Sequence, residues 1–127
     1  MQVKQSALAL TVADFDASVE FFTEHFGYRV QMSADGFASL GRDDAATNIV
    51  LLRKGLAVMP ASDRDRVADG VIIALVVDDL EGELARLKRE GVTITLPLRT
   101  EEWGERLFQV KDPNGVTVEL VDWVNTN

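Results

Sequence analysis

Hydrophobic and polar positions along the chain form a similar series of elements twice. In the first half, the apolar run Ser6–Val12 has strand length, and large side chains alternate along it with small ones. A helix follows, because four apolar residues recur at helical spacing between the N-cap residue Asp14 and the stop at Gly27. These four are Phe15, Val19, Phe22 and Phe26. Apolar runs separated by polar turns predict three more strands, at Tyr28–Met32, Gly36–Leu40 and Asn48–Lys54.

The second half repeats this order. Val71–Val77 is a strand-length apolar run, and a helix follows with the apolar stripe Leu80, Leu84 and Leu87. We expect Asp78 to cap this helix, with Glu81 at capping-box spacing, and Gly91 to end it. A strand at Val92–Leu96, a loop at 97–102 and a final hairpin complete the series.

This repeat predicts an α+β fold built from two βαβββ modules in a single domain. The modules span about residues 5–55 and 70–124, and a connector with the charged run Asp63–Arg66 joins them at 56–69. We expect each module to place its helix on one face of its sheet. The other faces are then free to curve around a shared cavity.

The final hairpin carries the strongest turn signal, Asp112-Pro113-Asn114-Gly115. If Asp112 pairs with Gly115, Phe108 faces Glu119 and Arg106 faces Val121, all on one face. The opposite face then holds Leu107, Val118 and Leu120, which would pack against a helix. Arg106 lies diagonal to Glu119 in this register, and it either pairs with that carboxylate or leaves it available to a ligand.

Small side chains mark the predicted cavity. Ala7 and Ala9 alternate with larger residues on the first strand, and Ala74 lies opposite Ile73 and Leu75 on the fifth. A close-packed core would fill such volume with larger groups. We therefore expect a ligand, water or a partner chain there.

Composition excludes several kinds of site. The chain has no cysteine and one histidine, His25, so thiolate chemistry is excluded and a zinc site of ordinary composition would lack ligands. The net charge of −8 argues against binding to nucleic acid or an anionic membrane, and it fits either plain solubility or a cationic ligand. No apolar run is long enough to span a bilayer, and the first residues lack a signal-peptide core, so we expect a cytoplasmic protein.

Together these motifs resemble the vicinal oxygen chelate superfamily of glyoxalases, bleomycin resistance proteins and dioxygenases. The resemblance rests on Leu10–Asp14 leading into Ser18–Phe22, on Val76–Leu80, and most strongly on Asp112–Gly115 followed by Val118-Glu119-Leu120. It implies paired βαβββ modules that form a cupped mixed sheet, commonly in a homodimer, and a small-molecule ligand.

The metal ligands of the superfamily are mostly missing at the positions that the resemblance implies. These positions fall on Ala7, near Ile72, near 51–54 and on Glu119, and only Glu119 could bind a metal. The resemblance therefore implies the branch without a metal or cofactor and without catalytic residues, in which bleomycin resistance proteins bind and sequester a drug.

Two alternatives to antibiotic-like sequestration stay open. One is a lyase or dioxygenase-type enzyme with an atypical site that uses Glu119, for example as a general base. The other is an accessory dimer without a small ligand.

We expect a cationic or aromatic ligand, and the residues that we expect to bind it are Trp103, Phe108, Phe37, Glu119 and Arg106. Trp103 follows two glutamates at a loop tip, where it could clamp a flat or cationic group or serve in hairpin or dimer packing. Phe108 could instead simply fill the cup. Trp123 is assigned to packing against the chain terminus or a partner subunit.

Overall fold

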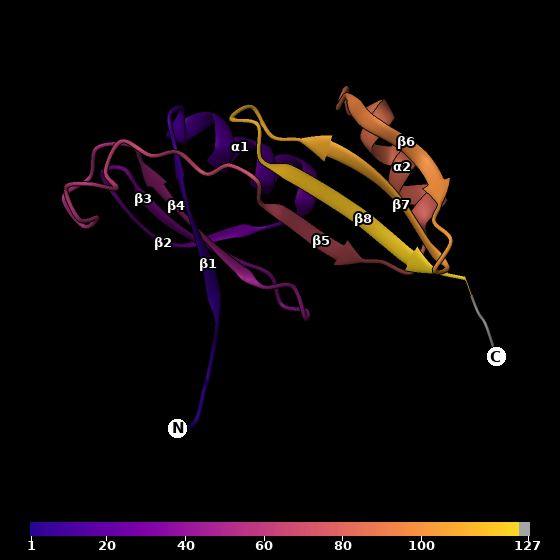
Figure 1. Cartoon of the computed structure of the whole chain (residues 1–127), viewed down its shortest axis with the longest axis horizontal. Coiled ribbons are helices and arrows are strands. Elements are labelled where there is room, and N and C mark those ends of the chain that lie inside the picture. Colours follow the sequence, from indigo (N-terminus) through magenta and orange to yellow (C-terminus); the bar gives the residue numbers. More distant parts are fainter. Residues whose placement is uncertain (125–127) are drawn as a thin grey trace. The chain divides into compact units, whose positions relative to one another are not determined.

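The computed structural model describes residues 1–124, which divide into a unit ending at Asp69 and a unit beginning at Gly70 (Figure 1). Unit 1 contains β1 (Ala7–Val12), α1 (Phe15–Phe26), β2 (Arg29–Ala34), β3 (Phe37–Gly41) and β4 (Asn48–Arg53). Unit 2 contains β5 (Ile72–Val76), α2 (Leu80–Arg89), β6 (Ile94–Thr100), β7 (Glu105–Lys111) and β8 (Thr117–Trp123). The α+β fold of two βαβββ modules is confirmed. That the two act as one domain stays a prediction.

The two units share one topology. Their sheets have the strand orders β1-β4-β3-β2 and β5-β8-β7-β6, with a parallel pair at β1–β4 and at β5–β8. The first three elements of unit 1 begin at residues 7, 15 and 29, and their counterparts in unit 2 begin at 72, 80 and 94, in each case 65 residues later. The repeat therefore extends to the register of the elements.

Helix α1 begins and ends where the sequence predicts. The Asp14 side chain accepts a hydrogen bond from the backbone N–H of Ala17 at 3.2 Å, which satisfies an otherwise unpaired donor of the first turn. Gly27 has a φ of 67°, a left-handed conformation that glycine adopts without strain, and its N–H bonds to the Phe22 carbonyl.

Helix α2 and strand β6 differ in detail from the prediction. The N-cap of α2 is Asp79, which accepts from the N–H of Gly82 at 3.1 Å, so the expected cap at Asp78 is wrong by one residue. Strand β6 continues to Thr100, so the loop expected at 97–102 is wrong for most of its length. Pro97 fits within it because β6 is an edge strand with irregular pairing, where a missing N–H costs little.

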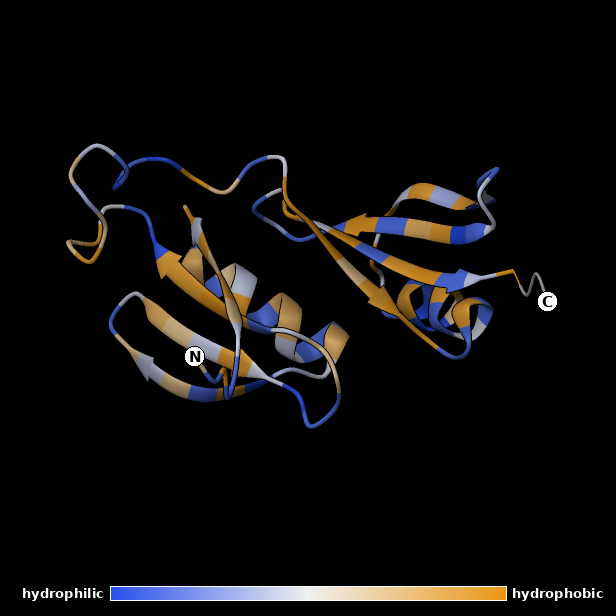
Figure 2. Cartoon of the chain, turned by 60° about the horizontal axis from the view of Figure 1, so that its bottom comes forward, coloured by the Kyte–Doolittle hydropathy of each residue, from blue (hydrophilic) through white to orange (hydrophobic). Residues whose placement is uncertain are grey.

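Each sheet has a helix-covered face and an opposite face, which we call the distal face. In unit 1 the helix-covered face holds Leu10, Val12, Leu40, Ile49 and Leu51, each at most 2% exposed. In unit 2 it holds Ile73, Phe108, Val110, Val118 and Leu120, which are all buried. Both helices alternate between hydrophobic and hydrophilic residues, as expected for helices covered on one side (Figure 2). Neither is long and apolar enough to cross a membrane.

Candidate functional site

Glu119 lies in the middle of β8 on the distal face of unit 2. Its partner across the sheet is Ala74 on one side and Gln109 on the other. The Gln109 side chain donates a hydrogen bond from Nε2 to Glu119 Oε1 at 2.9 Å, whereas Ala74 offers only a methyl group. The carboxylate is thus oriented by an amide on one side and has a small, exposed neighbour on the other. It can accept a hydrogen bond from a group placed above Ala74.

The turn between β7 and β8 sets this arrangement. Asp112 is buried, and its Oδ1 accepts hydrogen bonds from the N–H groups of Asn114 and Val116, both at 2.9 Å. Gly115 has a φ of 85° and donates its N–H to the Asp112 carbonyl, so it forms a bulge after a tight turn. The bulge adds one residue to the connection, and Lys111 pairs with Thr117.

This bulge makes the predicted register wrong by one residue. Glu119 faces Gln109 instead of Phe108, and Phe108 faces Leu120. Because side chains alternate along a strand, the shift moves every predicted β7 residue to the other face of the sheet.

Phe108 and Arg106 therefore lie on the helix-covered face, and the prediction that they share the face of Glu119 is wrong. Phe108 is fully buried. Arg106 pairs with Asp122 on β8, and its Nη1 lies 2.7 Å from Glu81 Oε1 on α2. Hydrogen bonds to these two carboxylates raise the pKa of Arg106, those to Asp122 most strongly. Of the two alternatives that the sequence leaves open, Arg106 does not pair with Glu119, because it links the sheet to the helix through Asp122 and Glu81.

Trp103 lies in the turn that precedes β7, at the far end of that strand from the Asp112 turn. Its side chain is 65% exposed, and its indole Nε1 donates a hydrogen bond to Glu105 Oε1 at 3.1 Å. Glu105 is the cross-strand partner of Trp123, which is 54% exposed. The indole of Trp103 is thus exposed in the turn. Whether it touches a ligand stays a prediction.

Phe37 belongs to the distal face of unit 1. It begins β3, pairs with Leu52 of β4 and is half-buried. The other four predicted ligand residues belong to unit 2. Of the five, the structure brings only Glu119 onto the distal face of unit 2, with Trp103 in the turn at its edge and Phe37 in the other unit.

Unit 1 lacks the polar pair of unit 2 at the equivalent position. Ala9 is the third residue of β1 as Ala74 is of β5, and Ala9 pairs with Val50 where Ala74 pairs with Glu119. Val50 in turn pairs with Ser39 where Glu119 pairs with Gln109. The sheet pairing thus identifies Val50, rather than 51–54, as the counterpart of Glu119, and valine has no atom that binds a metal.

The residues present do not fit the metal centre that the sequence resemblance implies. Its positions hold Ala7, Val50, Ile72 and Glu119, which supply one carboxylate and three hydrocarbon side chains. A zinc site uses three or four protein ligands, and Ca²⁺ takes six to eight oxygen ligands. Within residues 1–124, no group of three or more His, Cys, Asp or Glu side chains is placed to hold a metal ion.

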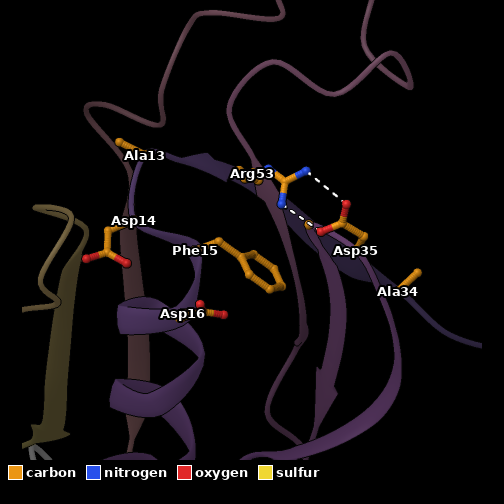
Figure 3. A pocket seen from close by; sticks show the side chains of 8 residues that line it. Ala13, Asp14, Phe15, Asp16, Ala34, Asp35 and Arg53 are labelled. Atoms are coloured by element: carbon orange, nitrogen blue, oxygen red, sulfur yellow. Dashed lines mark hydrogen bonds and ion pairs between the residues drawn. The ribbon is translucent and has the colours of Figure 1, made fainter.

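Unit 1 also has an open pocket of about 590 Å³ at the start of α1, and it contains none of the predicted site residues (Figure 3). Arg53 crosses its rim to Asp35, with Nη1 and Oδ1 2.8 Å apart. This bond lowers the pKa of Asp35. The half-buried ring of Phe15 and the carboxylate of Asp16 complete the side of the pocket formed by the helix.

Sequence reasoning missed Gln109, and the signal for it lies in the turn. A glycine at the last position of Asp-Pro-Asn-Gly is typical of a turn followed by a glycine bulge. Pairing of Asp112 with Val116, instead of with Gly115, would have predicted Gln109 opposite Glu119.

A family model matches most of the chain, and solved structures share its fold. Residues 4–120 match the model of the Glyoxalase/Bleomycin resistance protein/Dioxygenase superfamily. A glyoxalase/bleomycin resistance protein/dioxygenase from Nocardioides is 21% identical with a TM-score of 0.77, over 100% of this chain and 87% of that chain. An integron cassette protein from the mobile metagenome of V. cholerae is 25% identical with a TM-score of 0.73, over 95% and 96% of the two chains.

A lactoylglutathione lyase from Agrobacterium tumefaciens is 17% identical with a TM-score of 0.71, over 94% of this chain and 93% of that chain. Likeness at this level of identity reports the fold and leaves the chemistry open. No curated protein sequence matches the chain.

Proposed function

The chain belongs to the glyoxalase/bleomycin resistance protein/dioxygenase superfamily, and we propose that it binds and sequesters a small molecule without using a metal ion. One observation carries the proposal: Glu119 stands beside Ala74, and the implied partner ligands are replaced by Ala7, Val50 and Ile72. A single carboxylate beside an exposed methyl group has hydrogen-bonding capacity for a ligand, but it lacks the ligand set of a metalloenzyme.

Glu119 is the residue to which we assign ligand recognition. Gln109 holds one carboxylate oxygen at 2.9 Å, so the carboxylate is oriented before a ligand arrives. A ligand donor group above Ala74 would then bind at little entropic cost. Trp103 is proposed to add an apolar contact at the edge of this face, and Phe37 of unit 1 is also proposed to contact the ligand. Phe108 and Arg106 are proposed to support the sheet beneath Glu119, because their side chains lie on the helix-covered face.

We further propose that the ligand is antibiotic-like and that the chain acts as a homodimer. The family description, which includes bleomycin resistance, supports the first point. Exposed apolar residues on the edge strand β5 support the second, because Ile72 is 54% and Val76 is 68% exposed on the distal face. Light scattering after size exclusion should give twice the chain mass.

Drug recovery tests the proposed function. Purified protein is mixed with metal-free bleomycin, free drug is measured after equilibrium dialysis, and total drug is analysed by mass spectrometry. Sequestration predicts a fixed stoichiometry and chemically unchanged drug. Glu119→Gln and Ala74→Leu should weaken binding at least about tenfold, since the first removes the charge and the second fills the space beside it. Ala85→Leu, the same change at an exposed position of α2, should not. Absence of binding, or a chemically altered drug, contradicts the proposal.

An enzyme that uses Glu119 as a general base is a second candidate. The bond from Gln109 favours it, because it fixes one carboxylate oxygen and leaves the other to accept a proton. Turnover of the hemithioacetal of methylglyoxal and glutathione, lost in Glu119→Gln, would establish this candidate in place of sequestration.

A further inference from the structure

Both tryptophans of the chain are exposed at one end of unit 2. Trp103 is 65% and Trp123 is 54% exposed, and the sequence contains no other tryptophan. Tryptophan is usually well buried, and exposed aromatic groups that cluster on a surface mark binding sites. The packing of Trp123 against the chain terminus or a partner subunit stays a prediction, and within the single chain more than half of its surface is exposed.

One carboxylate lies between the two indoles. Glu105 accepts the N–H of the Trp103 indole at 3.1 Å, and it stands directly across the sheet from Trp123. Directly opposed residues in an antiparallel pair have Cβ atoms about 5 Å apart on the same face. The arrangement therefore presents an aromatic group, a carboxylate and a second aromatic group side by side.

Backbone hydrogen bonds hold this end of the hairpin in place. The Glu101 N–H donates to the Glu105 carbonyl at 2.7 Å, and the Gly104 N–H donates to the Glu101 carbonyl at 3.0 Å. The Val124 N–H bonds to the Gly104 carbonyl at 2.7 Å, which ties the end of β8 to the turn. The backbone on both sides of the two indoles is thus held by hydrogen bonds. A ligand would not need to order the turn before β7 when it binds.

The cations nearest in sequence are committed to other carboxylates. Arg99 Nε lies 2.6 Å from Glu101 Oε1. Arg106 points to the helix-covered face, where it pairs with Asp122. The negative charge of Glu105 is therefore met by the indole N–H of Trp103, a neutral donor that does not cancel it.

We propose that Trp103, Glu105 and Trp123 form a clamp for an organic cation, a positively charged nitrogen that carries apolar substituents. The indole faces attract the cation and cover its apolar groups, and the carboxylate supplies the opposite charge. Glu105 also acts as a positioning residue, because its bond to Nε1 fixes the Trp103 ring.

This inference deepens the proposed function, on which it rests, by naming a ligand class. Trp123 is four residues from Glu119 along β8, which is about 14 Å at the rise of a strand. A molecule that contacts both positions must be extended. A small organic cation would contact the clamp alone, which makes the clamp testable separately from Glu119.

The probe is choline, compared with its uncharged isostere 3,3-dimethylbutan-1-ol. A ¹H–¹⁵N correlation spectrum of the full chain contains two indole N–H signals, one from each tryptophan. Choline should shift both signals saturably at millimolar concentration and bind about three- to tenfold tighter than the neutral isostere, as expected for exposed cation–π contacts plus one charge. If choline moves neither signal, or if both compounds act equally, the clamp is wrong.

Variants separate the parts of the clamp. Glu105→Gln keeps an acceptor for the indole N–H but removes the charge, so it should abolish the preference for choline while the Trp103 signal stays near its native position. Glu102→Gln removes a charge from the same turn and should keep the preference. Trp123→Leu should weaken choline binding about threefold, read on the remaining indole signal. Equal losses in the two glutamate variants would overturn the clamp in favour of general charge.

The bleomycin experiment distinguishes failure of the clamp from failure of the proposed function. Glu119→Gln should weaken bleomycin binding at least about tenfold and leave the choline-induced shifts of the indole signals unchanged. Bleomycin binding without choline shifts would overturn the clamp and leave the proposed function standing. Choline shifts without bleomycin binding would keep the clamp and overturn sequestration of that drug.

Discussion

The two units have one topology but differently filled interiors. Unit 1 packs an aromatic group around α1, in which the rings of Phe22 and Tyr28 meet edge to face with centroids 5.9 Å apart. The residues of this group are Phe21, Phe22, Phe26 and Tyr28. Unit 2 uses aliphatic side chains with one buried aromatic residue, Phe108. A helix-covered face must be filled with apolar side chains, but aromatic and aliphatic residues can both fill it. The two units therefore share a fold although their core residues differ.

The distal faces differ in the chemistry of their side chains. At one equivalent position unit 2 has the bonded pair Gln109–Glu119, and unit 1 has Ser39 and Val50. No helix packs on these faces, and their residues differ at this position, although Leu107 and Val121 on the distal face of unit 2 are buried. In such a doubled fold, functional differences between the units are therefore expected on the distal faces, whereas the helix-covered faces set stability.

The largest effect is expected in the two cores. Phe22→Ala should lower the free energy of unfolding by about 4 kcal/mol, and Leu87→Ala, at the corresponding position of α2, by about 3 kcal/mol. Both side chains are at most 1% exposed, so each truncation leaves a cavity. Urea unfolding followed by circular dichroism measures both. A loss below about 1 kcal/mol in either would contradict the assigned packing of that unit.

The Asp112 turn of unit 2 should come next. Asp112→Ala removes two buried hydrogen bonds and should cost about 2 kcal/mol. Asp112→Asn keeps an acceptor oxygen, so it should lose less than half as much in the same urea titration. Equal losses would show that the charge, rather than these two bonds, stabilises the turn.

Gly115 should have a smaller effect of a different origin. No atom would lie within 4 Å of an added Cβ, so Gly115→Ala costs only the strain of a positive φ, about 1 kcal/mol. Gly115→Asn should cost less, because asparagine tolerates this conformation. Nuclear Overhauser contacts between Gln109 and Glu119 report the register in both variants. If Gly115→Asn costs as much stability as Gly115→Ala, or more, the glycine bulge is contradicted.

The smallest effect is a pH dependence confined to unit 1. Burial raises the pKa of the Tyr28 phenol above its ordinary value of 10.0. Above about pH 10 the unfolded phenol loses its proton while the native one keeps it, so stability falls as pH rises through this range. Tyr28 is the one tyrosine, so tyrosinate absorbance reads it alone. Tyr28→Phe should reduce the alkaline loss of stability. An unchanged loss would mean that other groups cause it.

The sequence predicts the fold well because its signals are local. Helix caps such as Asp14 and Gly27 act on their own turn, and alternation within β8 alone assigns Glu119 to the face opposite Val118 and Leu120. Apart from the cap of α2, which lies one residue later than predicted, the errors occur where a prediction depends on how two strands pair. The faces of Phe108 and Arg106 follow from the hairpin register, which depends on one bulged glycine. Pro97 lies in a strand because the sheet ends there, which the local pattern does not reveal.

Titration of divalent cations tests the central claim most directly, that the distal face of unit 2 has kept its carboxylate and lost its metal ligands. Zn²⁺ and Mn²⁺ are titrated by calorimetry into the full chain without an affinity tag, alongside Glu119→Gln. We expect no one-to-one binding that depends on Glu119. Stoichiometric binding of either ion that Glu119→Gln abolishes would contradict the claim and place a metal centre on this face.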